Sequence, residues 1–202
     1  DGQWFLRAGD RVLANIIVPP RQPKAAIGAE EINARITEIG AEALPVIEAD
    51  DPSALPEGVA SIVISKCYGS DLAEAIIDEC GVEITRDDPG EQGYVIEFVK
   101  FRGKRVIFLC GSDPQGSLYA AVTFRNLLEG DAEGVGAVRA TVRDWPDFKW
   151  RGTGSLMQMR KSLPVYGNTG DEMVDALKEH VDWMLRAKLN LLGDYLYGGE
   201  DA

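Results

Sequence analysis

Carboxylates near the end of the sequence are the first residues whose type and spacing could support chemistry. Asp194 lies in an apolar run, and Glu200 and Asp201 follow it. Two carboxyl groups that face one substrate can divide the roles of general acid and general base. A surface tail explains Glu200 and Asp201 more simply, however, and we assign no catalytic residue in this sequence.

Asp171 and Glu172 form a second acidic pair, whose position explains it without chemistry. Thr169 precedes Glu172 by three residues, which is the capping-box pattern of a helix start. Carboxylates in a first helical turn are also favoured by the helix dipole. The pair therefore predicts the beginning of a helix over residues 171–187.

Residues that commonly bind metals are few and widely separated. His180 is the single histidine, and it lies among charged residues without a second ligand nearby. Cys67, Cys80 and Cys110 form no Cys-x-x-Cys pair, so we predict neither a metal site nor a cofactor. Cys110 ends an apolar run typical of a buried thiol. Cys67 and Cys80 flank a predicted helix, and whether they pair stays open.

Trp145, Trp150 and Trp183 are candidates for ligand contact, because aromatic rings can stack on the apolar faces of sugars. Tryptophans at a boundary between domains more often act as buried packing anchors. We favour the packing interpretation for all three.

The composition of the 202 residues is typical of a globular protein, with 45% apolar and 27% charged residues. No apolar run approaches the roughly 20 residues of a membrane-spanning helix, so we expect no membrane partner. The net charge of −12, with scattered Lys and Arg, argues against nucleic acid as a partner. The N-terminus shows no basic region followed by an apolar stretch, as a secretory signal would.

Residues 1–143 alternate between strand-like and helix-like patterns, which predicts an α+β domain with helices packed on a mixed sheet. The predicted strands cover residues 11–18, 44–49, 60–66, 93–100, 104–110 and 138–142, and a loop covers 130–136. Residues 93–110 form a hairpin candidate. Helix boundaries are predicted by Gly40, by Ser70 with Gly81, and by Asp113-Pro114.

Residues 144–202 predict a linker and one strand–helix–strand unit. An apolar face of the 171–187 helix is followed by a strand-like run over 189–197. A parallel unit of this kind needs neighbours on its open sheet edges. We therefore expect it to be the first piece of a larger domain, and self-association through the unpaired strands is a possible consequence.

Three segments together resemble a known arrangement. Residues 93–128 contain a Gly-Tyr strand, an Ile-containing strand and a Gly-x-x-Tyr helix; residues 144–152 read Asp-x-Pro-x-Phe-x-x-Arg-Gly; residues 188–190 read Lys-Leu-Asn. The chain resembles the accessory domain and barrel opening of family-twenty β-N-acetylhexosaminidases, related α-glucuronidases and family-eighty-four enzymes. One departure is that Arg151-Gly152 is not followed by the Asp-x-x-Arg-His of family twenty.

The resemblance implies a non-catalytic accessory domain over 1–143 and the first β-α-β of a TIM-type (β/α)8 barrel over 144–202. Arg160 then follows the first barrel strand, where related hexosaminidases use an arginine to bind sugar hydroxyls. The alternative is a solvated loop cation next to Lys161. Arg160 is our single candidate substrate-binding residue.

By resemblance, the parent protein hydrolyses glycosides of N-acetylhexosamine- or uronic-acid-type sugars without a metal, and its partner is a carbohydrate. The acidic pair of the family lies on a fourth barrel strand, so the 202 residues alone are expected to be inactive. The resemblance also favours a secreted or periplasmic location. The alternative hypothesis is a free-standing carbohydrate-binding or interaction module without catalysis.

Overall fold

The computed structural model describes residues 3–153 and 170–192. The chain divides into two compact units, residues 1–147 and residues 148–202. Each unit is described by itself.

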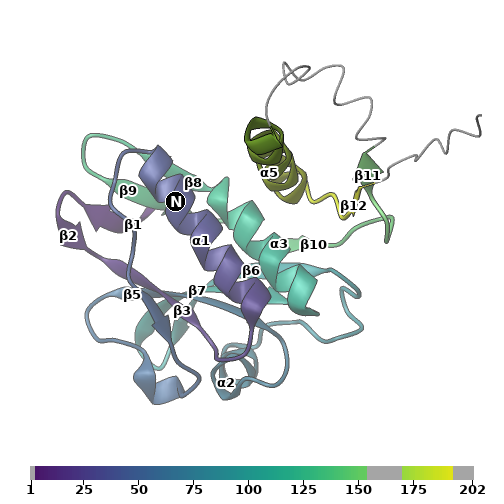
Figure 1. Ribbon diagram of the computed structural model, residues 1–202. Coiled ribbons are helices and arrows are strands. Elements are labelled where there is room, and N and C mark those ends of the chain that lie inside the picture. Colours follow the sequence, from purple (N-terminus) through teal and green to yellow (C-terminus); the bar gives the residue numbers. More distant parts are fainter. Residues whose placement is uncertain (1–2, 154–169, 193–202) are drawn as a thin grey trace, which may run out of the picture. The chain divides into compact units, whose positions relative to one another are not determined.

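A six-stranded mixed sheet forms the centre of the first unit (Figure 1). The strand order is β10 (Val142–Asp144), β6 (Tyr94–Phe101), β7 (Lys104–Gly111), β5 (Ala60–Lys66), β3 (Ala14–Val18) and β4 (Val46–Glu48). The strands β4, β3, β5 and β7 are parallel, whereas β6 and β10 are antiparallel to their neighbours. The predicted hairpin of β6 and β7 and the mixed sheet are confirmed.

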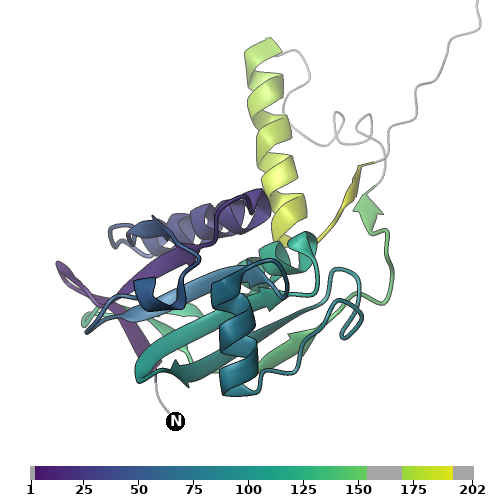
Figure 2. The ribbon, with the colours of Figure 1, turned by 90° about the horizontal axis from the view of Figure 1, so that it is seen from below.

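Helices cover both faces of this sheet (Figure 2). On one face, α2 (Asp71–Cys80) packs its apolar side chains against Val63 of β5 and Phe108 of β7. On the other face, α1 (Pro23–Glu38) and α3 (Pro114–Arg125) lie close together. This approach is possible because Gly28 has no side chain, whose Cβ atom would collide with Ala121 and contact Ile64. Because Val63 and Ile64 are successive residues of β5, they point to opposite faces of the sheet and belong to two separate cores.

The predicted helix boundaries are confirmed. The Ser70 hydroxyl accepts a hydrogen bond from the Ala73 amide at the start of α2, and Gly81 ends that helix in the left-handed conformation. The Asp113 carboxylate accepts a hydrogen bond from the Gly116 amide at the start of α3, where Pro114 occupies the first turn. Gly40 follows α1 with a φ of +97°.

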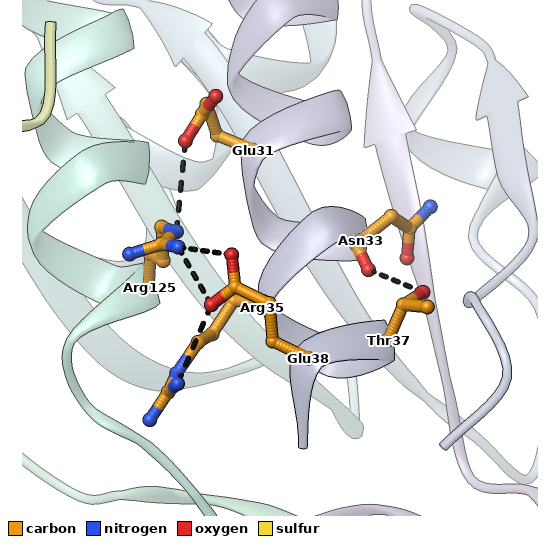
Figure 3. Close-up of polar contacts among 6 residues, drawn as sticks. All are labelled: Glu31, Asn33, Arg35, Thr37, Glu38 and Arg125. Carbon is orange, nitrogen blue, oxygen red and sulfur yellow. Dashed lines mark hydrogen bonds and ion pairs between the residues drawn. The ribbon is translucent and has the colours of Figure 1, made fainter. Parts of the chain in front are cut away.

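An ion-pair cluster joins α1 and α3 on the surface (Figure 3). The Arg125 guanidinium of α3 lies 2.6 Å from the Glu38 carboxylate and 3.5 Å from the Glu31 carboxylate, both on α1. Arg35 also reaches Glu38, at 3.4 Å. Because the Arg125 side chain is mostly buried, this cluster holds the helices in register more firmly than a solvated pair would.

A second, antiparallel sheet is the main difference from the sequence prediction. Its order is β2 (Arg11–Val12), β1 (Gln3–Ala8), β9 (Val135–Val138) and β8 (Leu128–Gly130). The strand predicted over 11–18 is divided between β2 and β3, and the loop predicted over 130–136 contains the ends of β8 and β9. The strand predicted over 138–142 was also wrong in position, because pairing stops at Val138 and resumes in β10.

The second unit contains β11 (Gly152–Thr153), α5 (Gly170–Arg186) and β12 (Leu191–Leu192). The two strands pair in parallel, Gly152 with Leu191 and Thr153 with Leu192. The predicted strand–helix–strand order is therefore present in the described part of this unit.

Among the described residues, the helices are too short or too polar to cross a membrane.

Candidate functional site

The predicted substrate-binding residue, Arg160, lies outside the described residues, as do Thr169, Asp194, Glu200 and Asp201. The structure describes β11 and β12, the two strands that precede these residues in the sequence. Because β11 and β12 are parallel, the chain leaves both strands at the same edge of the pair. Arg160 follows β11 in sequence, and Asp194 follows β12.

Arg151 and Asn190 hold β11 and β12 together. The Asn190 side chain accepts a hydrogen bond from the Arg151 amide and donates one to the Lys149 carbonyl, each at 2.8 Å. The Arg151 guanidinium donates to the carbonyls of Lys188, at 2.9 Å, and Phe148, at 2.7 Å. The arginine and asparagine of the two short motifs thus fix the beginning of one strand against the beginning of the other.

Gly152 is required by the close approach of these strands. A Cβ atom at this position would lie 2.7 Å from the Leu191 carbonyl oxygen and 3.0 Å from the Leu191 Cβ atom. In the Arg-Gly pair of the motif, Arg151 therefore holds the two strands together, and Gly152 makes the close approach of the neighbouring strand possible. Its role in the described residues is structural.

Three segments of the motif pattern meet at the Tyr94 hydroxyl. Tyr94 of β6 donates a hydrogen bond to the Asp144 carboxylate of β10, at 2.6 Å, and lies 2.7 Å from the Thr123 hydroxyl of α3. Since the single Tyr94 proton goes to Asp144, Thr123 must donate to the Tyr94 oxygen. Burial first, and then the Asp144 carboxylate, raises the pKa of Tyr94 well above its ordinary value. The hydroxyl therefore stays protonated and holds β10 to the sheet and to α3.

The Gly111–Gly116 segment explains another part of the pattern. A Cβ atom at Gly111 would lie 2.0 Å from the Ser117 amide nitrogen, and one at Gly116 would lie 2.1 Å from the Gly93 carbonyl oxygen. The turn from β7 into α3 thus packs backbone against backbone. Sequence reasoning recognised Gly116 as part of a motif but could not identify its contact, because Gly93 is distant in sequence.

The cysteines are free thiols in the structure. Burial raises the pKa of the Cys110 thiol, the most buried of the three, as well as those of Cys67 and Cys80. A raised thiol pKa reduces the thiolate fraction and with it the nucleophilicity. None of the three is therefore prepared for covalent chemistry. No group of three or more metal-binding side chains was found in the described residues.

The tryptophans differ from the packing interpretation. Trp145 is 54% exposed, Trp150 is 64% exposed and Trp183 is 52% exposed. Trp145 belongs to the first unit, where about half of its surface is exposed. His180 is half-buried and lies against the Trp183 ring, with 5.2 Å between the ring centroids.

Comparisons with known proteins give a consistent result at the level of fold. No protein-family model matches the sequence, and no curated protein matches it. Among solved structures, CpGH84B matches 98% of this chain with 28% of its own, at 14% identity and a TM-score of 0.58. The chitobiase of Flavobacterium johnsoniae matches 95% of this chain with 24% of its own, at 20% identity and a TM-score of 0.56. The family-twenty β-N-acetylhexosaminidase of Streptomyces coelicolor A3(2) matches 95% of this chain with 32% of its own, at 16% identity and a TM-score of 0.52.

These likenesses define a glycoside-hydrolase-like fold, and they confirm the predicted resemblance at that level. The chain spans about a quarter to a third of each of these three structures. At such low identities the likeness concerns the fold alone.

Proposed function

We propose that the chain is the accessory region of a glycoside hydrolase together with the opening β-α-β of its (β/α)8 barrel. The observation that carries the proposal is the parallel pairing of β11 and β12 across α5, in a chain whose fold recurs in glycoside hydrolases. A parallel pair joined through a helix is the repeating unit of such a barrel. In this proposal, residues 1–143 form the non-catalytic accessory domain.

The substrate of the whole protein is a carbohydrate, of the N-acetylhexosamine or uronic-acid type. Support comes from the named neighbours, which include a chitobiase and a β-N-acetylhexosaminidase. Arg160 contributes to substrate binding, because active sites of these barrels form where the chain leaves the carboxyl ends of the strands. A planar guanidinium can bind two neighbouring hydroxyl groups or one carboxylate.

The 202 residues alone lack catalysis in this proposal, since the acid and base belong to strands beyond β12. The outer edges of β11 and β12 are unpaired among the described residues, so self-association through them is also proposed.

Hydrolysis assays test this directly. Nitrophenyl glycosides of N-acetylglucosamine, N-acetylgalactosamine, glucose and glucuronic acid would be offered to the 202-residue chain and to the full product of its reading frame. We expect no turnover by the former and hydrolysis of the N-acetylhexosaminide or glucuronide by the latter. Turnover by the 202-residue chain, or none by a folded longer product, would contradict the proposal.

Arg160→Ala in the active longer protein tests the residue assignment. Loss of a charge-assisted hydrogen bond is worth about 1.5–3 kcal/mol, so we expect kcat/KM to fall by about ten- to a hundredfold. Lys161→Ala is the matched control, because it removes the adjacent cation. Equal effects of the two substitutions would indicate a general loss of charge and not a specific contact.

A further inference from the structure

Strand β4 forms an open edge of the six-stranded sheet. It pairs with β3 on one side, and no further strand pairs with it among the described residues. The Pro45 carbonyl accepts a hydrogen bond from the Ile16 amide of β3, at 2.9 Å, and the Ala49 amide also donates to β3, at 3.2 Å. Successive residues of a strand direct their backbone groups to opposite sides, so those of Val46 and Glu48 point away from the sheet. An added strand can use these donors and acceptors.

A groove of about 590 Å3 lies between this open edge and α1. The buried residues Val18 and Ala29 supply apolar surface to it, and so does Val46, which is 52% exposed. The side chain of Ile47, the next residue of β4, instead packs against the core on the α2 face of the sheet. An apolar side chain on an unpaired edge strand is a feature to which another polypeptide can add.

Asn33 of α1 lines the groove and holds the start of β4 in place. Its side chain donates a hydrogen bond to the Leu44 carbonyl, at 3.0 Å, and accepts one from the Leu44 amide, at 2.8 Å. The helix and the edge strand are therefore fixed against each other before any partner binds. A prearranged site loses less entropy on binding than one that must first be ordered.

The charges of the groove have a single sign, which indicates the kind of partner. Its charged lining residues are Glu30 of α1 and Glu48 of β4, and both are exposed. Within residues 3–153 and 170–192, neither carboxylate forms an ion pair. A second copy of this chain, paired edge to edge, would add two more carboxylates and a further net charge of −12. Like charges disfavour that pairing, whereas basic side chains complement the groove.

We infer that the open edge of β4 binds an extended, basic segment of another protein, which adds to the sheet as a further strand. Strand side chains that share a face are two residues apart, and Val46 and Glu48 both line the groove. A partner residue beside Val46 is therefore apolar, and the residue two positions from it, beside Glu48, is Lys or Arg. The inference concerns the first unit and does not depend on the proposed hydrolase activity.

Nuclear magnetic resonance titration of the ¹⁵N-labelled 202-residue chain tests this inference. The probe is the capped peptide Thr-Lys-Thr-Val-Thr-Lys-Thr, and the control is its counterpart with glutamate in place of both lysines. We expect the lysine peptide to shift the amide signals of Val46 and Glu48 in a saturable manner and the glutamate peptide to leave them unchanged. Unchanged signals with the lysine peptide, or equal shifts with both peptides, would overturn the inference. So would signals that move with the concentration of the chain alone, because a second copy would then occupy the edge.

Two pairs of substitutions sharpen the test. Glu48→Gln should weaken binding of the lysine peptide about two- to fivefold, as expected for a solvent-exposed ion pair, whereas Glu133→Gln, at an exposed position elsewhere, should not. Val46→Pro and Val46→Ala both remove the valine side chain, but only proline removes the outward amide, which β3 does not use. Val46→Pro should therefore weaken binding several-fold more than Val46→Ala. Unchanged binding in Glu48→Gln and in a folded Val46→Pro variant would overturn the inference.

Discussion

At the scale of single residues, the Tyr94 hydroxyl has the clearest energetic role. It links β6, β10 and α3 through its contacts with Asp144 and Thr123. Tyr94→Phe keeps the ring but leaves the partly buried Asp144 carboxylate without this donor. We expect the free energy of unfolding to fall by about 1–3 kcal/mol, measured by urea denaturation.

Thr123→Val is the companion variant, because it removes the second hydrogen bond and keeps the one to Asp144. It should cost less than Tyr94→Phe. An equal or larger cost for Thr123→Val would mean that the bond to Asp144 contributes little.

The raised pKa of Tyr94 also predicts a dependence on pH. Burial, followed by Asp144, raises the pKa in the folded protein, whereas the unfolded chain titrates near the ordinary value of about 10. Above that pH the unfolded state loses its proton first, so the folded state loses stability. The advantage of the wild type over Tyr94→Phe should therefore be constant below about pH 9 and shrink as the pH rises above about 10. Paired denaturation curves measure it, and a constant difference up to pH 11 would contradict this account.

At the scale of elements, Asn190 tests the clamp between β11 and β12. Asn190→Ala removes its acceptor for the Arg151 amide and its donor to the Lys149 carbonyl. We expect faster hydrogen exchange at the Arg151 and Leu191 amides, by about tenfold, since each neutral hydrogen bond contributes roughly 0.5–1.5 kcal/mol.

Asn190→Asp is the matched control for this variant. It keeps the acceptor for Arg151 and places an acceptor opposite the Lys149 carbonyl. The Arg151 amide should then retain more of its protection against hydrogen exchange than the neighbouring amides do. Unchanged exchange in both variants would mean that the strand pair does not depend on Asn190.

The elements that the sequence predicts well are those with local signals. Ser70, Asp113 and Gly81 act on their own helices, and the β6–β7 hairpin joins neighbouring runs. The second sheet contains two hairpins of neighbouring strands, β1–β2 and β8–β9, but its central pairing joins Gln3 of β1 to Val138 of β9, which are far apart in the sequence. Three of its four strands are only two to four residues long, so alternation of apolar residues has little length in which to appear there.

The functional residues were predictable to a different extent. The glycines and Arg151 were recognisable as parts of motifs, but their contacts were not, because Gly152 meets Leu191 and Gly116 meets Gly93 across the fold. Likewise, Tyr94, Thr123 and Asp144 occur in three separate segments, and only the folded sheet brings them together.

At the scale of the whole molecule, the first unit should fold independently. It contains both cores of the central sheet and the second sheet, all within residues 1–147. We expect a protein comprising residues 1–147 to unfold cooperatively in urea, with a midpoint close to that of the same transition in the 202-residue chain. A non-cooperative transition would mean that residues after 147 complete the core.

The position of β10 has a mechanical consequence. The chain passes from the first unit to the second through this edge strand, which is held by three residue pairs with β6. A pulling force transmitted along the backbone from residues after Asp147 therefore reaches the first unit at Asp144. At this point the Tyr94 hydroxyl donates its hydrogen bond to the Asp144 carboxylate. This hydrogen bond must therefore break before β10 separates from β6 and the force reaches the central strands.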